Sequence, residues 1–147
     1  MRIAIGADHG AFTRKGEVIE HLKSQGHEVK DFGTYDPKAS DYPEIGRSVA
    51  RAVVSGEYDR GIVMCTTGIG ISIVANKIKG VRCALCSDVT SARLTRLHND
   101  ANILSMGAGI IGPNLTMDIV DMFMNTEFSG EERHVRRISH IEPETEE

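Results

Sequence analysis

Short apolar runs alternate along this chain with longer segments whose apolar residues recur at helical spacing. The runs predict strands at Arg2–Ala7, Glu28–Phe32, Arg60–Cys65, Arg82–Cys86 and Ile103–Met106. The intervening segments predict helices at Phe12–Gln25, Pro43–Ser55, Ile71–Lys77, Asp88–Leu97 and Leu115–Met124, with Asp88 or Ser87 as the cap of the fourth. Such alternation is typical of a parallel sheet with helices on both faces and right-handed crossovers. We therefore expect an α/β fold: a single doubly wound domain with a five-stranded parallel sheet.

This sheet predicts a ligand crevice at one edge. We expect the strand order 2-1-3-4-5, in which the winding reverses between strands one and three, and ligands bind outside the carboxyl ends of the strands at such a point. Strand one ends in Gly6-Ala7-Asp8-His9-Gly10, and strand three ends in Cys65-Thr66-Thr67-Gly68-Ile69-Gly70. A carboxylate, an imidazole, a thiol, a hydroxyl and several backbone donors should meet there, which suits acid–base chemistry on a small anionic substrate.

The thiol of Cys65 is the main candidate for a reacting group. It follows an apolar β-branched run and precedes a glycine-rich turn into a helix, where free backbone N–H groups bind negative charge. A thiol beside such a turn can act as a nucleophile or a base. The alternative is a buried structural cysteine before an ordinary strand-to-helix turn.

Other candidates also have structural alternatives. Asp8 is either a catalytic carboxylate or the cap of the helix that starts near Phe12, and His9 is either a ligand or a solvated loop residue. His98 falls at a helix end, where the dipole alone favours a cation. Arg133 and Arg137 are four residues apart on a predicted helix and suit a phosphate, but the same arginines could pair with neighbouring glutamates.

Two motif interpretations are rejected. Cys83 and Cys86 are three residues apart in a strand and so point to opposite faces, and no second ligand pair follows, which argues against zinc. The glycines at Gly68 and Gly70 lack the third glycine of a dinucleotide fingerprint and follow strand three instead of strand one.

Composition narrows the class of protein. The 147 residues suit one domain, and we assign residues 1–141 to it and residues 142–147 to a charged, frayed tail. A net charge of -4 and a pI near 5.9 argue against nucleic acid or an anionic membrane as the main partner. There is no apolar stretch long enough to span a bilayer and no signal peptide, so we expect a cytoplasmic protein with reduced cysteines.

Several short motifs together resemble one family from Met1 to about Ile141. They are Ala7-Asp8-His9-Gly10, Asp31-Phe32-Gly33-Thr34, Asp41-Tyr42-Pro43, the Cys65–Ser72 loop, Ala75-Asn76-Lys77, Gly80-Val81-Arg82, His98-Asn99-Asp100-Ala101-Asn102 and Arg133-His134 with Arg137. This pattern is similar to the type B ribose-5-phosphate isomerases and to the wider group with galactose-6-phosphate and allose-6-phosphate isomerases. The resemblance implies a Rossmann-like sheet, a metal-free and cofactor-free aldose–ketose isomerisation, and a homodimer or dimer of dimers with shared active sites.

The resemblance also implies roles for individual residues. Cys65 would be the base that moves a proton between C2 and C1 of the opened sugar through a cis-enediolate, and His98, supported by Asp8, would open the ring. The developing oxyanion would be stabilised by Thr67 and by N–H groups around Gly68, Ile69, Gly70 and Ser72. Substrate binding would fall to Asn99 at the sugar hydroxyls, Tyr42 at the pocket wall, and His9, Arg133 and Arg137 at the phosphate. His98 or the two arginines would reach in from a neighbouring subunit.

Three departures from the family pattern leave the substrate open. Thr66 stands where the family has glycine, Gly109 where it often has a phosphate-binding arginine, and Glu131-Glu132 where it has two glycines. The carboxylates would oppose an anion unless they point away. The alternatives to ribose 5-phosphate are therefore allose 6-phosphate, galactose 6-phosphate or a free aldose, or a catalytically silent sugar-phosphate-binding subunit.

Overall fold

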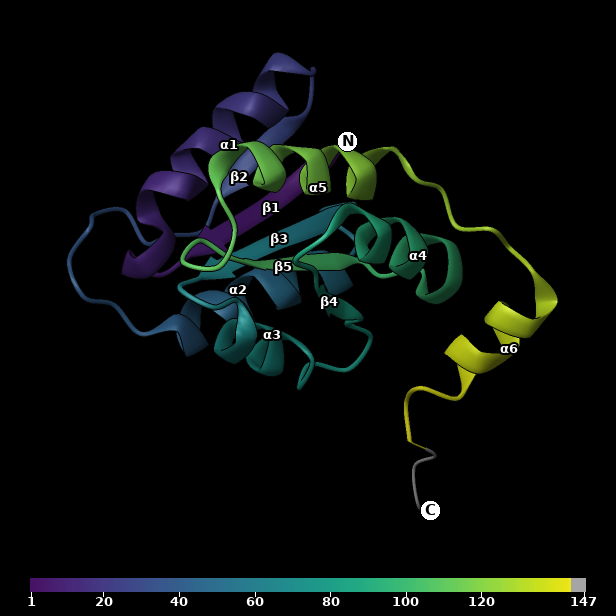
Figure 1. The fold of residues 1–147 in the computed structure, drawn as a ribbon. Helices are drawn as coiled ribbons and strands as arrows, with labels where there is room; N and C mark the ends of the chain where they lie inside the picture. The colour runs from purple at the N-terminus through teal and green to yellow at the C-terminus, as the bar shows by residue number, and fades with distance from the viewer. Residues whose placement is uncertain (144–147) are drawn as a thin grey trace.

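Five parallel strands form one sheet in the structure, a computed structural model that describes residues 1–143. The strands are β1 (Arg2–Ala7), β2 (Glu28–Asp31), β3 (Arg60–Cys65), β4 (Cys83–Leu85) and β5 (Ile103–Gly107). Every neighbouring pair is parallel, so all five carboxyl ends lie at one edge of the sheet, called here the carboxyl edge (Figure 1). The expected α/β class and five-stranded parallel sheet are confirmed.

The strand order differs from the expected one at one side. It is β2-β1-β3-β5-β4, so the expectation that strand four lies next to strand three was wrong. The burial of the two strands explains the order, because all five residues of β5 are buried whereas β4 is a three-residue strand that is only partly buried. A fully buried strand belongs inside a parallel sheet, and a very short strand is suited to the outermost position. The winding direction of the chain reverses between β1 and β3, as expected.

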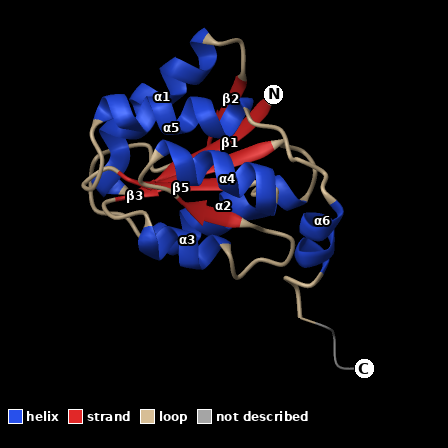
Figure 2. Cartoon of the chain, turned by 45° about the vertical axis from the view of Figure 1, so that its right-hand side comes forward, coloured by secondary structure: helices blue, strands red, loops and turns tan. Residues whose placement is uncertain are grey.

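Helices cover both faces of the sheet (Figure 2). One face carries α1 (Phe12–Ser24), α4 (Val89–Asn99) and α5 (Pro113–Asn125), and the other carries α2 (Tyr42–Val54) and α3 (Ile69–Ala75). Successive residues of β3 pack alternately on the two faces of the sheet. Ile62 and Met64 pack under α1 and α5, whereas Val63 and Cys65 pack under α2 and α3. No helix within residues 1–143 is long and apolar enough to cross a membrane.

Local signals explain where two of the helices begin. Asp88 caps α4, as expected, by accepting a hydrogen bond from the Ser91 N–H at 2.6 Å. Helix α3 starts two residues before the predicted Ile71, because Gly68 adopts a φ of 76° and turns the chain into the helix. A short 3₁₀ helix, η1 (His9–Ala11), was not expected between β1 and α1.

The last helix stands apart from the sheet. Helix α6 (Glu132–Ser139) follows an extended segment and packs against α4 at the side of the molecule (Figure 1). Beyond it, the Glu142 carboxylate accepts a hydrogen bond from the Gly80 N–H at 2.7 Å. The first residue of the predicted tail is therefore held against the domain, whereas residues 144–147 lie outside the described part of the chain.

A buried cation fastens the loop that follows β2. The Lys15 side chain is 3% exposed, and its ammonium group lies 2.9 Å from an Asp31 carboxylate oxygen and also donates to the Thr34 carbonyl. The same carboxylate oxygen accepts from the Gly33 N–H at 2.8 Å. One lysine thus ties α1 to the start of the loop that leads to α2.

We expect Lys15→Met to lower the free energy of unfolding by about 1–3 kcal/mol, because the Asp31 carboxylate and the Thr34 carbonyl would lose their buried donor. Urea denaturation measures this effect. Lys23→Met is the matched control, since Lys23 is an exposed lysine of the same helix and should have an effect below about 0.5 kcal/mol. Equal effects of the two substitutions would contradict a fastening role for Lys15.

Candidate active site

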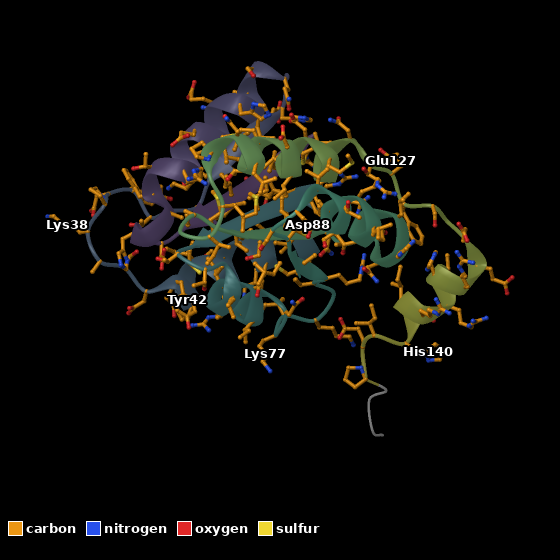
Figure 3. All side chains as sticks on the ribbon, viewed as in Figure 1. Lys38, Tyr42, Lys77, Asp88, Glu127 and His140 are labelled. Carbon is orange, nitrogen blue, oxygen red and sulfur yellow. The ribbon has the colours of Figure 1, made fainter. Side chains whose placement is uncertain are left out.

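The ends of β1 and β3 bring several of the predicted side chains to the carboxyl edge. Asp8 and His9 follow β1, and Cys65 is the last residue of β3. Beside them lies a cleft of about 650 Å³, lined by Asp8, His9, Ser40, Asp41, Tyr42, Pro43, Glu44 and Arg47. Figure 3 shows Tyr42 at this side of the molecule, close to the start of α2. This cleft lies between the residues that follow β1 and the start of α2, and no residue of β3 or of the turn after it is among its lining residues.

The sulfur of Cys65 is held under the turn that begins α3. The residue is 5% exposed, and its Sγ accepts a hydrogen bond from the Gly68 N–H at 3.1 Å. The Gly68 carbonyl in turn accepts from the buried Ser105 hydroxyl of β5 at 2.7 Å. Cys65 thus has a backbone donor on its sulfur at the carboxyl edge of the sheet.

The free N–H groups of the turn differ from those that the sequence suggested. The N–H of Gly68 donates to Cys65, that of Ile69 donates to the Thr67 hydroxyl at 3.2 Å, and that of Ser72 donates to the Gly68 carbonyl. Within residues 1–143, the N–H groups of Gly70 and Ile71 donate no hydrogen bond, as expected for the first turn of a helix. These two are the backbone donors available to an anion.

Asp8, His9 and Tyr42 are each fixed by a neighbour. The Asp8 carboxylate accepts from the Gly10 N–H at 2.9 Å, so it caps η1 and not α1 as the alternative had it. His9 Nδ1 accepts from the Ser40 N–H at 3.2 Å, which leaves Nε2 as the proton-bearing nitrogen of the neutral ring. The Tyr42 ring packs on Gly70, where an added Cβ would lie 2.7 Å from the Tyr42 Cζ.

The other two cysteines lie in and beside β4. Burial, and then the neighbouring Cys86, raises the pKa of the Cys83 thiol, and burial together with Asp88 raises the pKa of the Cys86 thiol to about 11. Both therefore stay protonated near neutral pH. All three cysteines are free thiols, and no group of three metal-ligating side chains is assembled within residues 1–143.

Four predicted residues lie elsewhere in the same chain. Helix α4 follows β4 and runs back across the sheet, so His98 and Asn99 lie near the amino ends of the strands, opposite Cys65. A hollow of about 460 Å³ links the next residue, Asp100, to Met1 and Arg60 at those amino ends. In Figure 3, His140 beyond α6 and Tyr42 stand on opposite sides of the molecule. One chain therefore does not unite Cys65 with His98, Asn99, Arg133 and Arg137.

Helix α6 is held to α4 by two stacked imidazoles. The rings of His98 and His134 are 4.5 Å apart at their centroids and inclined by 19°. Arg133 on the same helix pairs with Glu131 at 3.0 Å, as the solvated-helix interpretation proposed, and both side chains are more than half exposed. Arg137 makes no ion pair within residues 1–143. The two arginines of the predicted phosphate site are thus at the surface, near His98.

Sequence reasoning missed three polar residues of this region. Ser105 was overlooked because it was counted as part of an apolar strand. A hydroxyl in a buried strand is nevertheless a signal, because it requires a hydrogen-bond partner. Ser40 lies in a loop without a regular pattern, and its contact with His9 spans 31 residues. Arg47 lies on an exposed face of α2, where the sequence pattern does not distinguish a residue of a site from an ordinary surface arginine.

Residues 3–141 match the profile of the family described as ribose/galactose isomerase. The chain belongs to this family. It is 44% identical over 140 residues to ribose-5-phosphate isomerase B of Escherichia coli (strain K12), which covers 95% of this chain and 93% of the relative. It is 44% identical over 128 residues to galactose-6-phosphate isomerase subunit LacB of Clostridium acetobutylicum, covering 87% and 74%. The solved structure of Clostridium thermocellum ribose-5-phosphate isomerase B has a TM-score of 0.94 at 51% identity, covering 96% and 95%.

Membership of the ribose/galactose isomerase family confirms the resemblance and the class of reaction. The chain is an aldose–ketose isomerase. The relatives differ in the sugar phosphate that they are named for, a pentose phosphate in one case and a hexose phosphate in another. The family therefore establishes the chemistry, and the substrate is a separate question.

We expect the docking of α6 to weaken as the pH falls. Burial, and then the charges of His98, Arg133 and Arg137, lower the pKa of His134 below its usual 6.5, while Glu131 opposes them. A histidine whose pKa is depressed in the folded state stabilises it above the unfolded pKa, and this contribution is lost as the pH falls through the folded value. An NMR titration of His134 should give a pKa below 6.5, and Glu131→Gln should lower it further. A pKa of 6.5 or above would contradict this account.

Proposed function

We propose that this chain interconverts ribose 5-phosphate and ribulose 5-phosphate, with the Cys65 thiolate as the base. The observation that carries the proposal is the position of Cys65, at the carboxyl end of β3 with the Gly68 N–H on its sulfur. Support for the substrate comes from relatives named ribose-5-phosphate isomerase B at 44% and 51% identity.

The proposed reaction begins with the open-chain aldose. Cys65 takes the proton from C2, the electrons of that bond form a C1–C2 double bond, and the carbonyl electrons move to O1 to give a cis-enediolate. The N–H groups of Gly70 and Ile71 and the Thr67 hydroxyl are available to stabilise this charge, and one such donor is worth about 10²–10³ in rate. Return of the proton to C1, with transfer of the O2 proton to O1, gives the ketose.

The remaining roles require a second copy of the chain. His98 would open the sugar ring with Asp8 in support, Asn99 would hold sugar hydroxyls, and Arg133 and Arg137 would bind the phosphate together with His9. Because His98 lies at the end of the chain's sheet opposite Cys65, we assign it to the site of a neighbouring subunit. The proposed assembly is a homodimer or a dimer of dimers.

An apolar surface beside the loop supports this assembly. Ile69 and Ile73 share one face of α3 and are 51% and 55% exposed, and Leu85, which touches Gly68, is 40% exposed. Contiguous exposed apolar side chains next to an incomplete site are typical of an interface. The cytoplasmic location and the absence of a metal or cofactor stay predictions.

The substrate is tested by a coupled assay of the purified chain. We expect the highest kcat/KM with ribose 5-phosphate, compared with allose 6-phosphate, galactose 6-phosphate, free ribose and free allose. A higher kcat/KM for a six-carbon sugar phosphate would show that the proposed substrate is wrong, but the reaction would still be an aldose–ketose isomerisation. Binding without turnover of every sugar would favour the silent-subunit alternative.

We expect Cys65→Ala to lower kcat by about 10²–10⁴ with little change in substrate Kd, because the thiolate acts on the C2 proton and adds little to ground-state binding. Steady-state kinetics and calorimetry measure the two constants. Cys86→Ala is the control, since that thiol is also buried but has a pKa near 11 and lies outside the proposed site. Near-normal turnover of Cys65→Ala would remove Cys65 from the mechanism.

A shared site predicts complementation between two inactive variants. Cys65→Ala and His98→Asn should each be slow on ribose 5-phosphate, but a mixed dimer has one site with both native residues. After subunit exchange at equal concentrations, about a quarter of the wild-type rate should return. His98→Asn alone should retain its initial rate from ribulose 5-phosphate, which has no furanose ring to open. No recovery in the mixture would mean that each site is built within one chain.

A further inference from the structure

Three residues that follow three adjacent strands pack against one another at the carboxyl edge. Gly10 follows β1, Thr66 follows β3 and Gly109 follows β5, and all three are exposed. A Cβ added to Gly10 would lie 2.1 Å from the Thr66 Oγ1, and a Cβ added to Gly109 would lie 2.9 Å from the Thr66 Cγ2. The two γ atoms of one threonine thus fill the space above both glycines.

The backbone does not demand glycine at these two positions. Neither Gly10 nor Gly109 is among the residues with positive φ, in contrast to Gly68. The requirement comes from Thr66, because a threonine has only one hydrogen on Cβ and can turn it toward one glycine at a time. Rotation about χ1 can relieve the clash of the Thr66 side chain with a Cβ at position 10 or at position 109, but not with both at once. The Thr66 backbone nitrogen and oxygen would stay 3.2 Å and 3.0 Å from the two added Cβ atoms in either case.

The Thr66 side chain also borders the site. It lies between Cys65 and Thr67 in the chain. The Cβ added to Gly10, which would clash with the Thr66 hydroxyl, would lie 3.2 Å from an Asp8 carboxylate oxygen, so the hydroxyl lies close to that carboxylate. Its backbone carbonyl is engaged with the Gly109 N–H at 2.8 Å, whereas its hydroxyl makes no hydrogen bond within residues 1–143. Thr66 is therefore exposed beside Cys65 and Asp8, and its side chain is free to meet a substrate.

We propose that Thr66, seated between Gly10 and Gly109, is a specificity-determining residue that limits the length of the sugar phosphate. The inference rests on the proposed isomerase function and extends it to substrate size. The Thr66 side chain has three heavy atoms, with its hydroxyl on the side of Asp8, whereas one more CHOH unit in a sugar adds two. Removing the side chain makes room for a six-carbon substrate, and a difference of that size in a pocket changes discrimination by about 10–200-fold.

The packing is tested first by thermal unfolding, which requires no activity. Gly10→Ala and Gly109→Ala should each lower Tm modestly, and together they should lower it by roughly 3–10 °C more than the sum of the single effects. In a Thr66→Gly background the same two substitutions should be additive. Additivity in both backgrounds would overturn the coupling of the three positions. If the double variant fails to fold with Thr66 but folds with Thr66→Gly, the coupling is supported.

The substrate role is tested by the ratio of kcat/KM for allose 6-phosphate to that for ribose 5-phosphate. Thr66→Gly should raise this ratio about tenfold or more, whereas Thr66→Val, which keeps the shape and loses the hydroxyl, should leave it within about threefold of wild type. An unchanged ratio in Thr66→Gly, or an equal change in Thr66→Val, would overturn size selection. A wild-type chain inactive on all the sugar phosphates would overturn the proposed function and the substrate role together, whereas an active wild type with an unchanged ratio overturns only the latter.

Discussion

Two consecutive hydrogen bonds connect the sheet to the sulfur of the candidate base. The Ser105 hydroxyl donates to the Gly68 carbonyl, and the Gly68 N–H donates to the Cys65 Sγ. The first depends on β5 lying directly against β3, which brings Ser105 of one strand under the turn that follows the other, whereas the second is local to that turn. The contact is tight, since a Cβ on Gly107 would lie 2.5 Å from the Thr67 backbone. The strand order therefore determines the geometry of the sulfur.

The direction of the helices determines what one chain can contribute. In a parallel sheet each helix returns from the carboxyl ends of the strands to the amino ends, so a residue at the start of a helix and one at its end serve opposite edges. Tyr42 starts α2 and lies in the cleft, whereas His98 nears the end of α4 and lies against His134. A catalytic set that includes both kinds of position requires two chains arranged so that opposite edges meet.

Periodicity and composition predicted the fold class well because the signals are local. Strands such as Arg60–Cys65 and caps such as Asp88 are specified by a few neighbouring residues, and the predicted bounds of the strands and main helices agree with the structure to within two positions. The order of β4 and β5 was missed because it depends on which strand is longer and more completely buried, which is a comparison between segments. The positions of Asp8, His9 and Cys65 at one edge followed from the topology. The contact of Ser40 with His9 could not be foreseen, because it joins a loop of irregular sequence to a residue 31 positions away.

The crowding around Thr66 restricts the order in which substitutions at this site can accumulate during evolution. Positions 10, 66 and 109 are remote in the sequence but share one small volume. A lineage that acquires side chains at both outer positions must first lose the branched residue at the centre, because every route that adds both before that loss passes through an overpacked intermediate. The reverse route is equally ordered, since threonine enters only after at least one outer position has become glycine. The packing at these three positions thus restricts the order in which they can be substituted, in either direction.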